Sequence, residues 1–214
     1  MTQVYFISGL GADHTVFDRL TLREDIEAHH LPWLVPKENE SLGHYARRMA
    51  EGIADPENAT LVGLSFGGIM SIEIAQRFPI KQVVLISSVK SKAEMPINFD
   101  LIGLMRLHQV VPPSRIMHIR ELAAWFFGVK TEDERNMLFG ILERSNERIV
   151  DWSTEQIIAW KGDHDVKNIR HIHGTADTAF PILKIKADKK VKGGPHFMVY
   201  THAKEVSAWL NEVL

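Results

Sequence analysis

The chain has 214 residues, of which 45% are hydrophobic, and this predicts a single domain with a sizeable buried core. The absence of cysteine excludes disulfides and thiolate metal sites, and the formal net charge of −2 at pH 7 indicates neither a nucleic-acid partner nor a membrane partner. Because no apolar run approaches the roughly 20 residues of a membrane span and a core strand follows Met1 almost at once, we expect a cytoplasmic protein.

The first quarter of the chain alternates apolar runs with turns and polar segments. Residues 3–8 predict a buried strand that ends in a glycine-containing turn, residues 9–14. Residues 18–28 are mixed polar and predict a helix, and residues 31–35 predict the next short strand, whose proline indicates an edge or entry position. Ser41 is typical of a helix N-cap, and apolar residues follow it at helical spacing. These are Leu42, Tyr45, Ala46, Met49 and Ile53.

A short apolar strand that ends at Gly63 leads directly into the pattern G-x-S-x-G around Ser65. Gly63 and Gly67 lie two positions before and after the serine, where they remove the Cβ atoms that a sharp strand-to-helix turn would bring together. Residues 68–77 predict the helix that follows, and its positive dipole end would point at the turn. The pattern therefore predicts a nucleophilic serine held above the sheet.

The remaining strands of the predicted sheet are residues 82–86, 169–173 and 189–192, and residues 203–214 predict a closing helix. With the strands before them they give six parallel strands. Because right-handed crossovers are the rule in such sheets, we expect the order 2-1-3-4-5-6 with helices on both faces.

Two further polar residues follow strands of this sheet, and both are suited to work with a serine nucleophile. Asp177 lies in a loop just after the strand at residues 169–173, and His196 follows a glycine pair after the last strand. A serine hydroxyl needs a base to take its proton, and the base needs a carboxylate to orient it. The chain order Ser65, Asp177, His196 is that of α/β-hydrolases, and Asp163, Asp165 and Asp188 are the competing carboxylates.

Between the fourth and fifth strands lie about eighty residues, far more than a crossover needs. We expect residues 1–87 and 166–214 to form the core and residues 88–165 to form a helical cap over Ser65. Four groups of apolar residues show helical spacing there. The groups are Leu101, Ile102, Leu104 and Met105; Leu122, Trp125, Phe126 and Phe127; Met137, Leu138, Ile141 and Leu142; and Ile157, Ile158 and Trp160. The aromatic residues of the second group are candidates for the wall of a substrate pocket.

With these motifs, the chain resembles a compact member of the α/β-hydrolase superfamily from Val4 to Val213, in a minimal version with a six-stranded sheet. The segment Gly193-Gly-Pro-His-Phe-Met198, followed by residues 203–210, is similar to the tail of the plant methylesterase and hydroxynitrile lyase branch. In that branch a lysine beside the histidine is characteristic of the lyases. Phe197 occupies this position here, which disfavours cyanohydrin chemistry.

The resemblance implies the roles of the site residues. Ser65 would be the nucleophile, His196 the base and Asp177 its orienting acid, and the backbone N–H groups of Leu10 and Phe66 would form the oxyanion hole. Many relatives have His-Gly where this chain has Ser8-Gly9. His14, in the same loop, joins Trp125, Phe126 and Phe127 as a candidate for the substrate pocket. The implied activity is hydrolysis of a small or medium carboxylic ester, with no cofactor and no metal.

Other interpretations of the sequence remain open. Between residues 101 and 120 there is no acidic residue, and five basic or histidine side chains there could hold an anionic substrate, as a thioesterase would need, or could simply be solvated. They are Arg106, His108, Arg115, His118 and Arg120. A lyase of the same fold, or a triad-retaining protein that only binds a small molecule, is also compatible with the pattern. His171 and His173 alternate along a strand, and we expect them to satisfy local hydrogen bonds rather than to bind metal.

Overall fold

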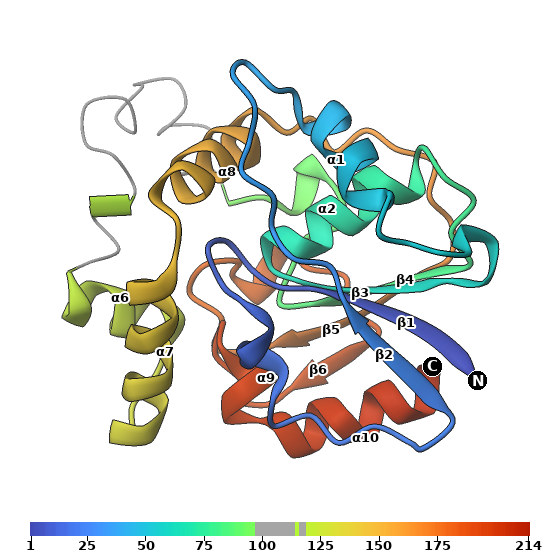
Figure 1. The fold of residues 1–214 in the computed structure, drawn as a ribbon. Coiled ribbons are helices and arrows are strands. Elements are labelled where there is room, and N and C mark those ends of the chain that lie inside the picture. The colour runs from blue at the N-terminus through green and yellow to red at the C-terminus, as the bar shows by residue number, and fades with distance from the viewer. Residues whose placement is uncertain (97–113, 116–118) are drawn as a thin grey trace.

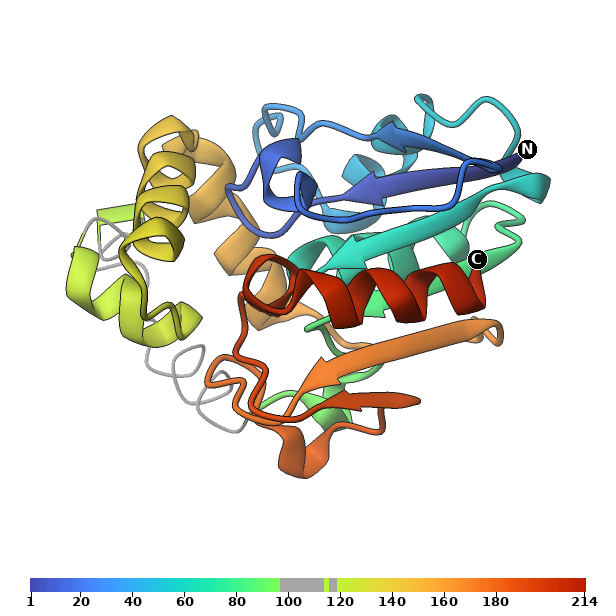
Figure 2. The same cartoon turned by 90° about the horizontal axis from the view of Figure 1, so that it is seen from below.

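The computed structural model describes residues 1–96, 114–115 and 119–214 and shows a parallel β-sheet between two layers of helices (Figures 1 and 2). The six strands of the sheet are β1 (Thr2–Ile7), β2 (Ile26–His30), β3 (Thr60–Leu64), β4 (Gln82–Ile86), β5 (Ile169–Gly174) and β6 (Lys189–Val191). The α-helices are α1 (Leu42–Ala50), α2 (Phe66–Ala75), α6 (Arg120–Phe127), α7 (Glu132–Arg144), α8 (Glu147–Ala159), α9 (Met198–Thr201) and α10 (Ala203–Val213). Short 3-10 helices, η1 to η4, span His14–Phe17, Pro56–Asn58, Lys92–Glu94 and Ile182–Lys184.

The strand order is β2-β1-β3-β4-β5-β6 and every pair is parallel, which confirms the predicted six-stranded sheet. In the register, Val4 of β1 lies between Ala28 of β2 and Thr60 of β3. The chain runs from β1 to β2 on one side and then returns to β3 on the other side of β1. The order therefore reverses next to β1, and in open α/β sheets the site lies outside the carboxyl ends of the strands at such a point.

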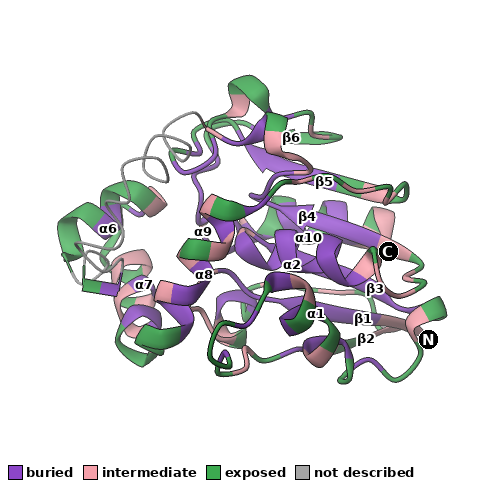
Figure 3. Ribbon diagram, turned by 90° about the horizontal axis from the view of Figure 1, so that it is seen from above, coloured by how far each residue is buried: buried purple, intermediate pink, exposed green. Residues whose placement is uncertain are grey.

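The strands at the centre of the sheet are buried (Figure 3). Their side chains alternate between two hydrophobic cores, one on each face of the sheet. Tyr5 and Ile7 of β1 face a core shared with α1, α2 and α8, whereas Val4 and Phe6 face a core shared with α10, α6 and α7. Each strand residue points to the opposite face from its neighbour, so continuous apolar runs are needed where both faces are covered. This accounts for the fully buried sequence of β3.

Two predictions in the first quarter of the chain are wrong. Residues 31–35 were expected to form the second strand and residues 18–28 a helix, but β2 occupies Ile26–His30 and residues 18–25 form turns and irregular structure. The backbone of residues 26–30 forms a strand because it pairs with β1. It lies at the edge of the sheet, so it pairs along one side only. An edge strand need not be apolar, since one row of its backbone groups and many of its side chains meet solvent.

The other predicted helices and strands lie within about two residues of their expected bounds. The Ser41 side chain accepts from the His44 N–H at 3.3 Å and caps α1 as expected. Helix α2 starts two residues earlier than predicted, directly after Ser65. The expected group Leu101, Ile102, Leu104 and Met105 lies outside the described residues.

Helices α6, α7 and α8 lie beyond and beside the carboxyl ends of the strands (Figures 1 and 2). Local sequence sets their bounds. Gly128 ends α6 with a left-handed backbone, φ 70°, that glycine adopts without strain. Thr131 and Glu134 form a reciprocal capping box that starts α7, and Asn146 caps α8. Within the described ranges, no helix combines the length and apolarity needed to cross a bilayer.

The end of α6 is attached to two loops that follow β5 and β6. The Thr178 hydroxyl donates to the Phe126 carbonyl oxygen at 2.5 Å, and the Phe197 N–H donates to the Phe127 carbonyl oxygen at 3.1 Å. A Cβ on Gly128 would come within 2.4 Å of the Pro195 Cβ, so the proline ring packs where only a glycine leaves room. The loops that carry Asp177 and His196 are thus tied to this helix.

Candidate active site

Ser65 occupies the sharp turn between β3 and α2. Its backbone lies at φ 53° and ψ −119°, a conformation that costs a non-glycine residue free energy and is found mainly at functional sites. Two hydrogen bonds hold it there: the Ser65 N–H donates to the Ile86 carbonyl oxygen at 2.9 Å, and the Ser88 hydroxyl donates to the Ser65 carbonyl oxygen at 2.7 Å. The turn is therefore fixed from β4 as well as from its own strand.

The two glycines of the pattern are required by close backbone packing. A Cβ on Gly63 would lie 2.4 Å from the Gly67 carbonyl oxygen. A Cβ on Gly67 would lie 2.2 Å from the carbonyl oxygen of Ile7 and 2.4 Å from that of Ser8. Because these contacts are with main-chain atoms, no rotation of a side chain could relieve them. The start of α2 therefore packs directly on the end of β1.

Ser65, His196 and Asp177 form a continuous hydrogen-bonded chain. The Ser65 Oγ lies 2.9 Å from His196 Nε2, and His196 Nδ1 lies 2.9 Å from Asp177 Oδ2. A carboxylate at neutral pH only accepts hydrogen bonds, so the proton of His196 resides on Nδ1 and Nε2 accepts from the serine. The structure thus brings together the three residues that the sequence singled out, although they lie up to 131 positions apart.

The environment of Asp177 keeps it ionised. Its side chain is fully buried, and this burial is the largest influence and raises the pKa. The charge of His196 and its hydrogen bond act in the opposite direction, together with His173 and the Phe180 N–H, which donates to Asp177 Oδ1 at 2.8 Å. The net effect is a pKa of Asp177 below its ordinary value.

The turn after β1 lies against Ser65 and is held by two polar side chains. A Cβ on Gly9 would be 3.5 Å from the Ser65 Cβ. The Ser8 hydroxyl donates to the Ala12 carbonyl oxygen at 2.6 Å, and the Trp33 Nε1–H lies 3.1 Å from Ser8 Oγ and 3.0 Å from the Gly9 carbonyl oxygen. Ser8 thus fixes the shape of this turn.

The two N–H groups expected to form an oxyanion hole come from this turn and from α2. Phe66 is the first residue of α2, so its N–H is one of the four at a helix start that no carbonyl of the helix can accept from. In the part of the chain that the structure describes, no backbone carbonyl accepts from the Leu10 N–H either. Both groups are therefore free to donate to a ligand.

Two of the four expected pocket residues lie next to His196. The ring centroids of Phe126 and Phe127 are 6.2 Å and 5.7 Å from that of His196. Trp125, in contrast, is 65% exposed. Phe180 was not expected, but its ring centroid lies 5.6 Å from that of His196. The only feature of the sequence that could have indicated Phe180 is its position three residues after Asp177, because the loop that carries Asp177 must approach His196.

His14 lines a different cavity, of about 240 Å³, between the turn after β1, the end of β2 and the junction of α7 with α8. Its wall includes Phe17, His30 and Ile149, but none of the three residues of the hydrogen-bonded chain. An ion pair of 2.8 Å between Asp13 and Arg144 crosses its rim. His14 itself is exposed.

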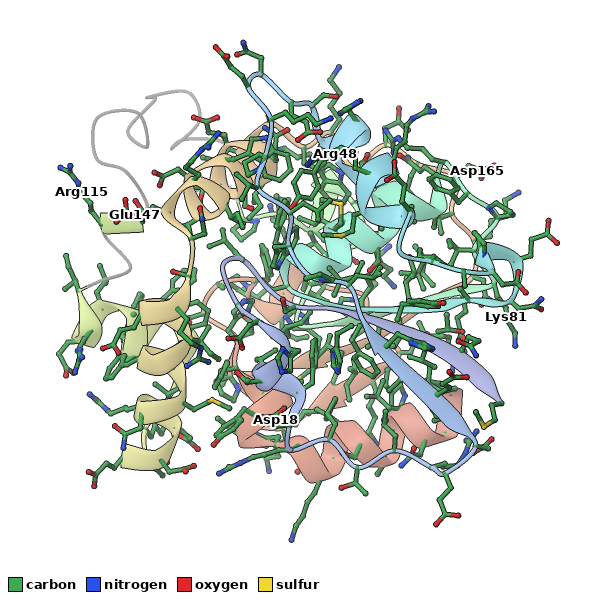
Figure 4. All side chains as sticks on the ribbon, viewed as in Figure 1. Asp18, Arg48, Lys81, Arg115, Glu147 and Asp165 are labelled. Atoms are coloured by element: carbon green, nitrogen blue, oxygen red, sulfur yellow. The ribbon has the colours of Figure 1, made fainter. Side chains whose placement is uncertain are left out.

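The basic segment gives little support for an anion site. Arg115 is exposed and points away from the sheet at the edge of the molecule (Figure 4), and Arg120 is exposed and pairs with Glu143 at 2.7 Å. Arg106, His108 and His118 lie outside the described residues. Among the residues that are described, no three His, Asp or Glu side chains are grouped so that they could hold a metal ion.

Two buried histidines lie behind Asp177, which the sequence analysis did not connect with the site. His173 Nε2 is 2.8 Å from the Phe180 carbonyl oxygen and 3.4 Å from Asp177 Oδ2. His171 Nε2 is 3.2 Å from His173 Nδ1. Both side chains make the local hydrogen bonds that their alternation along β5 indicated, but the link to Asp177 depends on the path of the following loop.

Comparison with known proteins identifies the fold. No protein-family model matches the chain, and no curated protein matches its sequence. Solved structures match it over nearly its whole length. They include a bromoperoxidase from Bacillus anthracis, 19% identical, with a TM-score of 0.73 and a match that covers 99% of this chain and 91% of that one. An esterase from Exiguobacterium antarcticum is 16% identical, with a TM-score of 0.70 over 99% and 91% of the two chains. A hydrolase from Oleispira antarctica is 12% identical, with a TM-score of 0.73 over 99% and 90%. The chain has the α/β-hydrolase fold, as its sequence predicted.

Proposed function

We propose that this protein is a serine hydrolase that cleaves a small or medium carboxylic ester through an acyl-enzyme. The observation that supports this most is the chain of two 2.9 Å hydrogen bonds from Ser65 through His196 to Asp177. It starts at a serine held in a strained turn and ends at a carboxylate that its surroundings keep ionised. That combination activates a hydroxyl that would otherwise be a weak nucleophile.

In the proposed reaction, Ser65 Oγ attacks the ester carbonyl carbon while His196 Nε2 takes the hydroxyl proton. Asp177 holds the imidazole in the required tautomer and stabilises the imidazolium that forms. The Leu10 and Phe66 N–H groups donate to the oxyanion of the tetrahedral intermediate. His196 then protonates the leaving alcohol, and a water molecule, activated by the same nitrogen, releases the acid and restores the serine. The reaction uses only groups of the chain and water, so we propose no cofactor.

We further propose that residues 88–165 act as a cap and supply part of the acyl pocket. Phe126 and Phe127, at the end of α6, and Phe180 bring three aromatic rings close to the His196 ring. Such a wall suits an apolar acyl group, because aromatic side chains bury a large area without demanding a hydrogen bond. Trp125 is not part of the proposed wall, because most of its surface meets solvent.

The test is turnover of p-nitrophenyl esters of graded chain length by the wild type and by Ser65→Ala. Loss of the hydroxyl should lower kcat by several orders of magnitude, up to the ~10⁶ known for loss of a triad serine, with an unchanged melting temperature. Ser71→Ala is the matched control, because Ser71 lies on α2 and its hydroxyl donates only to the Gly67 carbonyl oxygen at 2.8 Å.

The outcomes separate the proposed activity from its alternatives. A Ser65→Ala protein that keeps a tenth of the turnover would rule out the serine as nucleophile. Turnover of acyl thioesters but not of oxygen esters would indicate a thioesterase. Binding of a substrate analogue without turnover of any ester would favour a small-molecule binding protein on the same fold.

A further inference from the structure

We propose that His173 is a positioning residue for the active site, and that it holds Asp177 in place as an anion through a neutral imidazole whose tautomer is fixed by His171. This inference rests on the proposed function, in which Asp177 orients His196. It adds two residues behind the acid that the hydrolytic steps do not use.

The geometry links the two histidines to Asp177 in one direction. His171 and His173 alternate along β5 and point to the same face, and both are fully buried. The loop after β5 turns back beneath them, so that Asp177 Oδ2 and the Phe180 carbonyl oxygen both lie near His173 Nε2, at 3.4 Å and 2.8 Å. Two groups of the same loop therefore meet one imidazole N–H.

The hydrogen-bond partners determine where the protons lie. A carbonyl oxygen only accepts, so His173 Nε2 carries a proton. The neutral ring then accepts at Nδ1, and the group 3.2 Å away, His171 Nε2, must be the donor. This leaves His171 Nδ1 with a lone pair, and among the described residues this atom has no hydrogen-bond partner. A proton added there would have no acceptor, so His171 stays neutral.

Burial favours the same protonation state. It lowers the pKa of His171 well below the ordinary value and also lowers that of His173, in the second case against the attraction of Asp177. The other charged groups around the pair are Lys90 after β4, Glu94 of η3, and Asp188, whose carboxylate accepts from the His171 main-chain N–H at 2.7 Å. His196 faces His173 across Asp177.

A neutral donor is well suited to this position. The His173 Nε2–H points toward the loop, so its positive end stabilises the Asp177 carboxylate, and the His171 N–H polarises the His173 ring in the same sense. They add no full positive charge, which would compete with the His196 imidazolium for the same carboxylate and make its formation harder. The bond to the Phe180 carbonyl oxygen also fixes the loop whose N–H holds Asp177 Oδ1, so both carboxylate oxygens keep their orientation.

The experiment compares His173→Phe, which keeps a similar ring volume but removes the donor, with His173→Gln, whose side-chain amide can replace Nε2–H. Without the donor, Asp177 attracts the His196 proton more strongly. The pKa of His196 and the acid limb of kcat/KM should then move up by as much as about 1 pH unit, with one neutral hydrogen bond as the upper limit, because His173 Nε2 lies 3.4 Å from Asp177 Oδ2. We expect kcat to fall at least tenfold with KM nearly unchanged, and His173→Gln to restore most of both.

The pKa of His196 is read by NMR titration of its ring in protein without substrate, assigned with His196→Asn, so the result does not depend on ester turnover. A merely structural His173 would lower the melting temperature without moving this pKa, and that result would overturn the proposal. If His173→Phe does not fold, the proposal is tested on the wild type, from the NMR signals of the His173 ring nitrogens. They should show a neutral His173 with its proton on Nε2 at neutral pH, and a proton on Nδ1 or a doubly protonated ring there would overturn it.

If the wild type and Ser65→Ala are equally inactive on all esters while the NMR results are as expected, the proposed function fails and the positioning of Asp177 stands. If ester turnover is normal and substitution of His173 leaves the pKa of His196 unchanged, the proposed function stands and the positioning role of His173 fails.

Discussion

Gly67→Ala tests whether the close packing of α2 on β1 sets the geometry of the site. The added Cβ would lie 2.2 Å and 2.4 Å from the carbonyl oxygens of Ile7 and Ser8, whereas a carbon and an oxygen in favourable contact are about 3.3 Å apart. The start of α2 and the end of β1 must therefore separate by about 1 Å, because main-chain atoms cannot rotate away.

The expected cost follows from this displacement. Overpacking of this kind costs typically 1–3 kcal/mol. A loss of about 2 kcal/mol corresponds to a fall in melting temperature of roughly 4–8 °C for a chain of this size. The separation also moves the turn that carries Leu10 away from the N–H of Phe66. A 1 Å misplacement of catalytic groups can lower turnover about 100-fold.

The assay combines differential scanning calorimetry with turnover of p-nitrophenyl acetate, and Gly140→Ala is the matched control. Gly140 lies inside α7, and its added Cβ would meet only the flexible end of Arg144 at 3.1 Å. An alanine there should raise stability by up to about 1 kcal/mol through helix propensity. If Gly67→Ala melts within about 1 °C of the wild type and keeps its turnover, the packing argument is refuted.

Three further predictions concern other parts of the molecule. Because burial lowers the pKa of His171 and His173 in the folded protein, the unfolded chain takes up protons first as pH falls below about 6.5, and the free energy of unfolding should drop by up to about 1.4 kcal/mol per pH unit for each. Urea midpoints between pH 5 and 7 measure this, and a flat profile would contradict it. Ser41→Ala should lower the free energy of unfolding by about 1 kcal/mol and Ser41→Asn should barely change it, since only the alanine leaves the start of α1 uncapped. Equal losses of stability in urea melts of the two variants would exclude the cap as the cause. Phe127→Ala should lower kcat/KM for octanoate esters more than for acetate esters, at about 0.8 kcal/mol per methylene no longer buried, while the exposed Trp125→Ala leaves the ratio unchanged.

The sequence was informative wherever local and long-range forces agree. The strands β3, β4 and β5 are apolar runs buried on both faces, so their positions are visible without a structure. Right-handed crossovers then limit the strand orders that such a sheet can adopt. Ser65 and Asp177 each follow one of these strands, and parallel strands end at the same edge of a sheet, so the meeting of residues far apart in the chain could also be predicted.

The errors occurred where tertiary contacts outweigh local pattern. Trp33 lies in an apolar run that is not a strand, because its ring stacks on that of Phe66 at 5.1 Å and its N–H fixes the turn at Gly9. The strand β2 is polar because only one edge of it pairs. The link from His173 to Asp177 was also beyond the sequence, because alternation gives the face of a side chain but not the path of the loop that returns beneath it.

The attachment of α6 to the loops of Thr178 and Phe197 bears on how proteins of this fold can be recombined. A helical segment exchanged for that of another protein has to bring two carbonyl oxygens to the same places, or the loops that carry Asp177 and His196 lose these two hydrogen bonds. The Phe197 N–H can also report on the position of α6, because its hydrogen bond to the Phe127 carbonyl oxygen protects it from exchange only while α6 is in contact with this loop. The rate at which this N–H exchanges with deuterated solvent would measure how often the end of α6 separates from the loop, without any substrate.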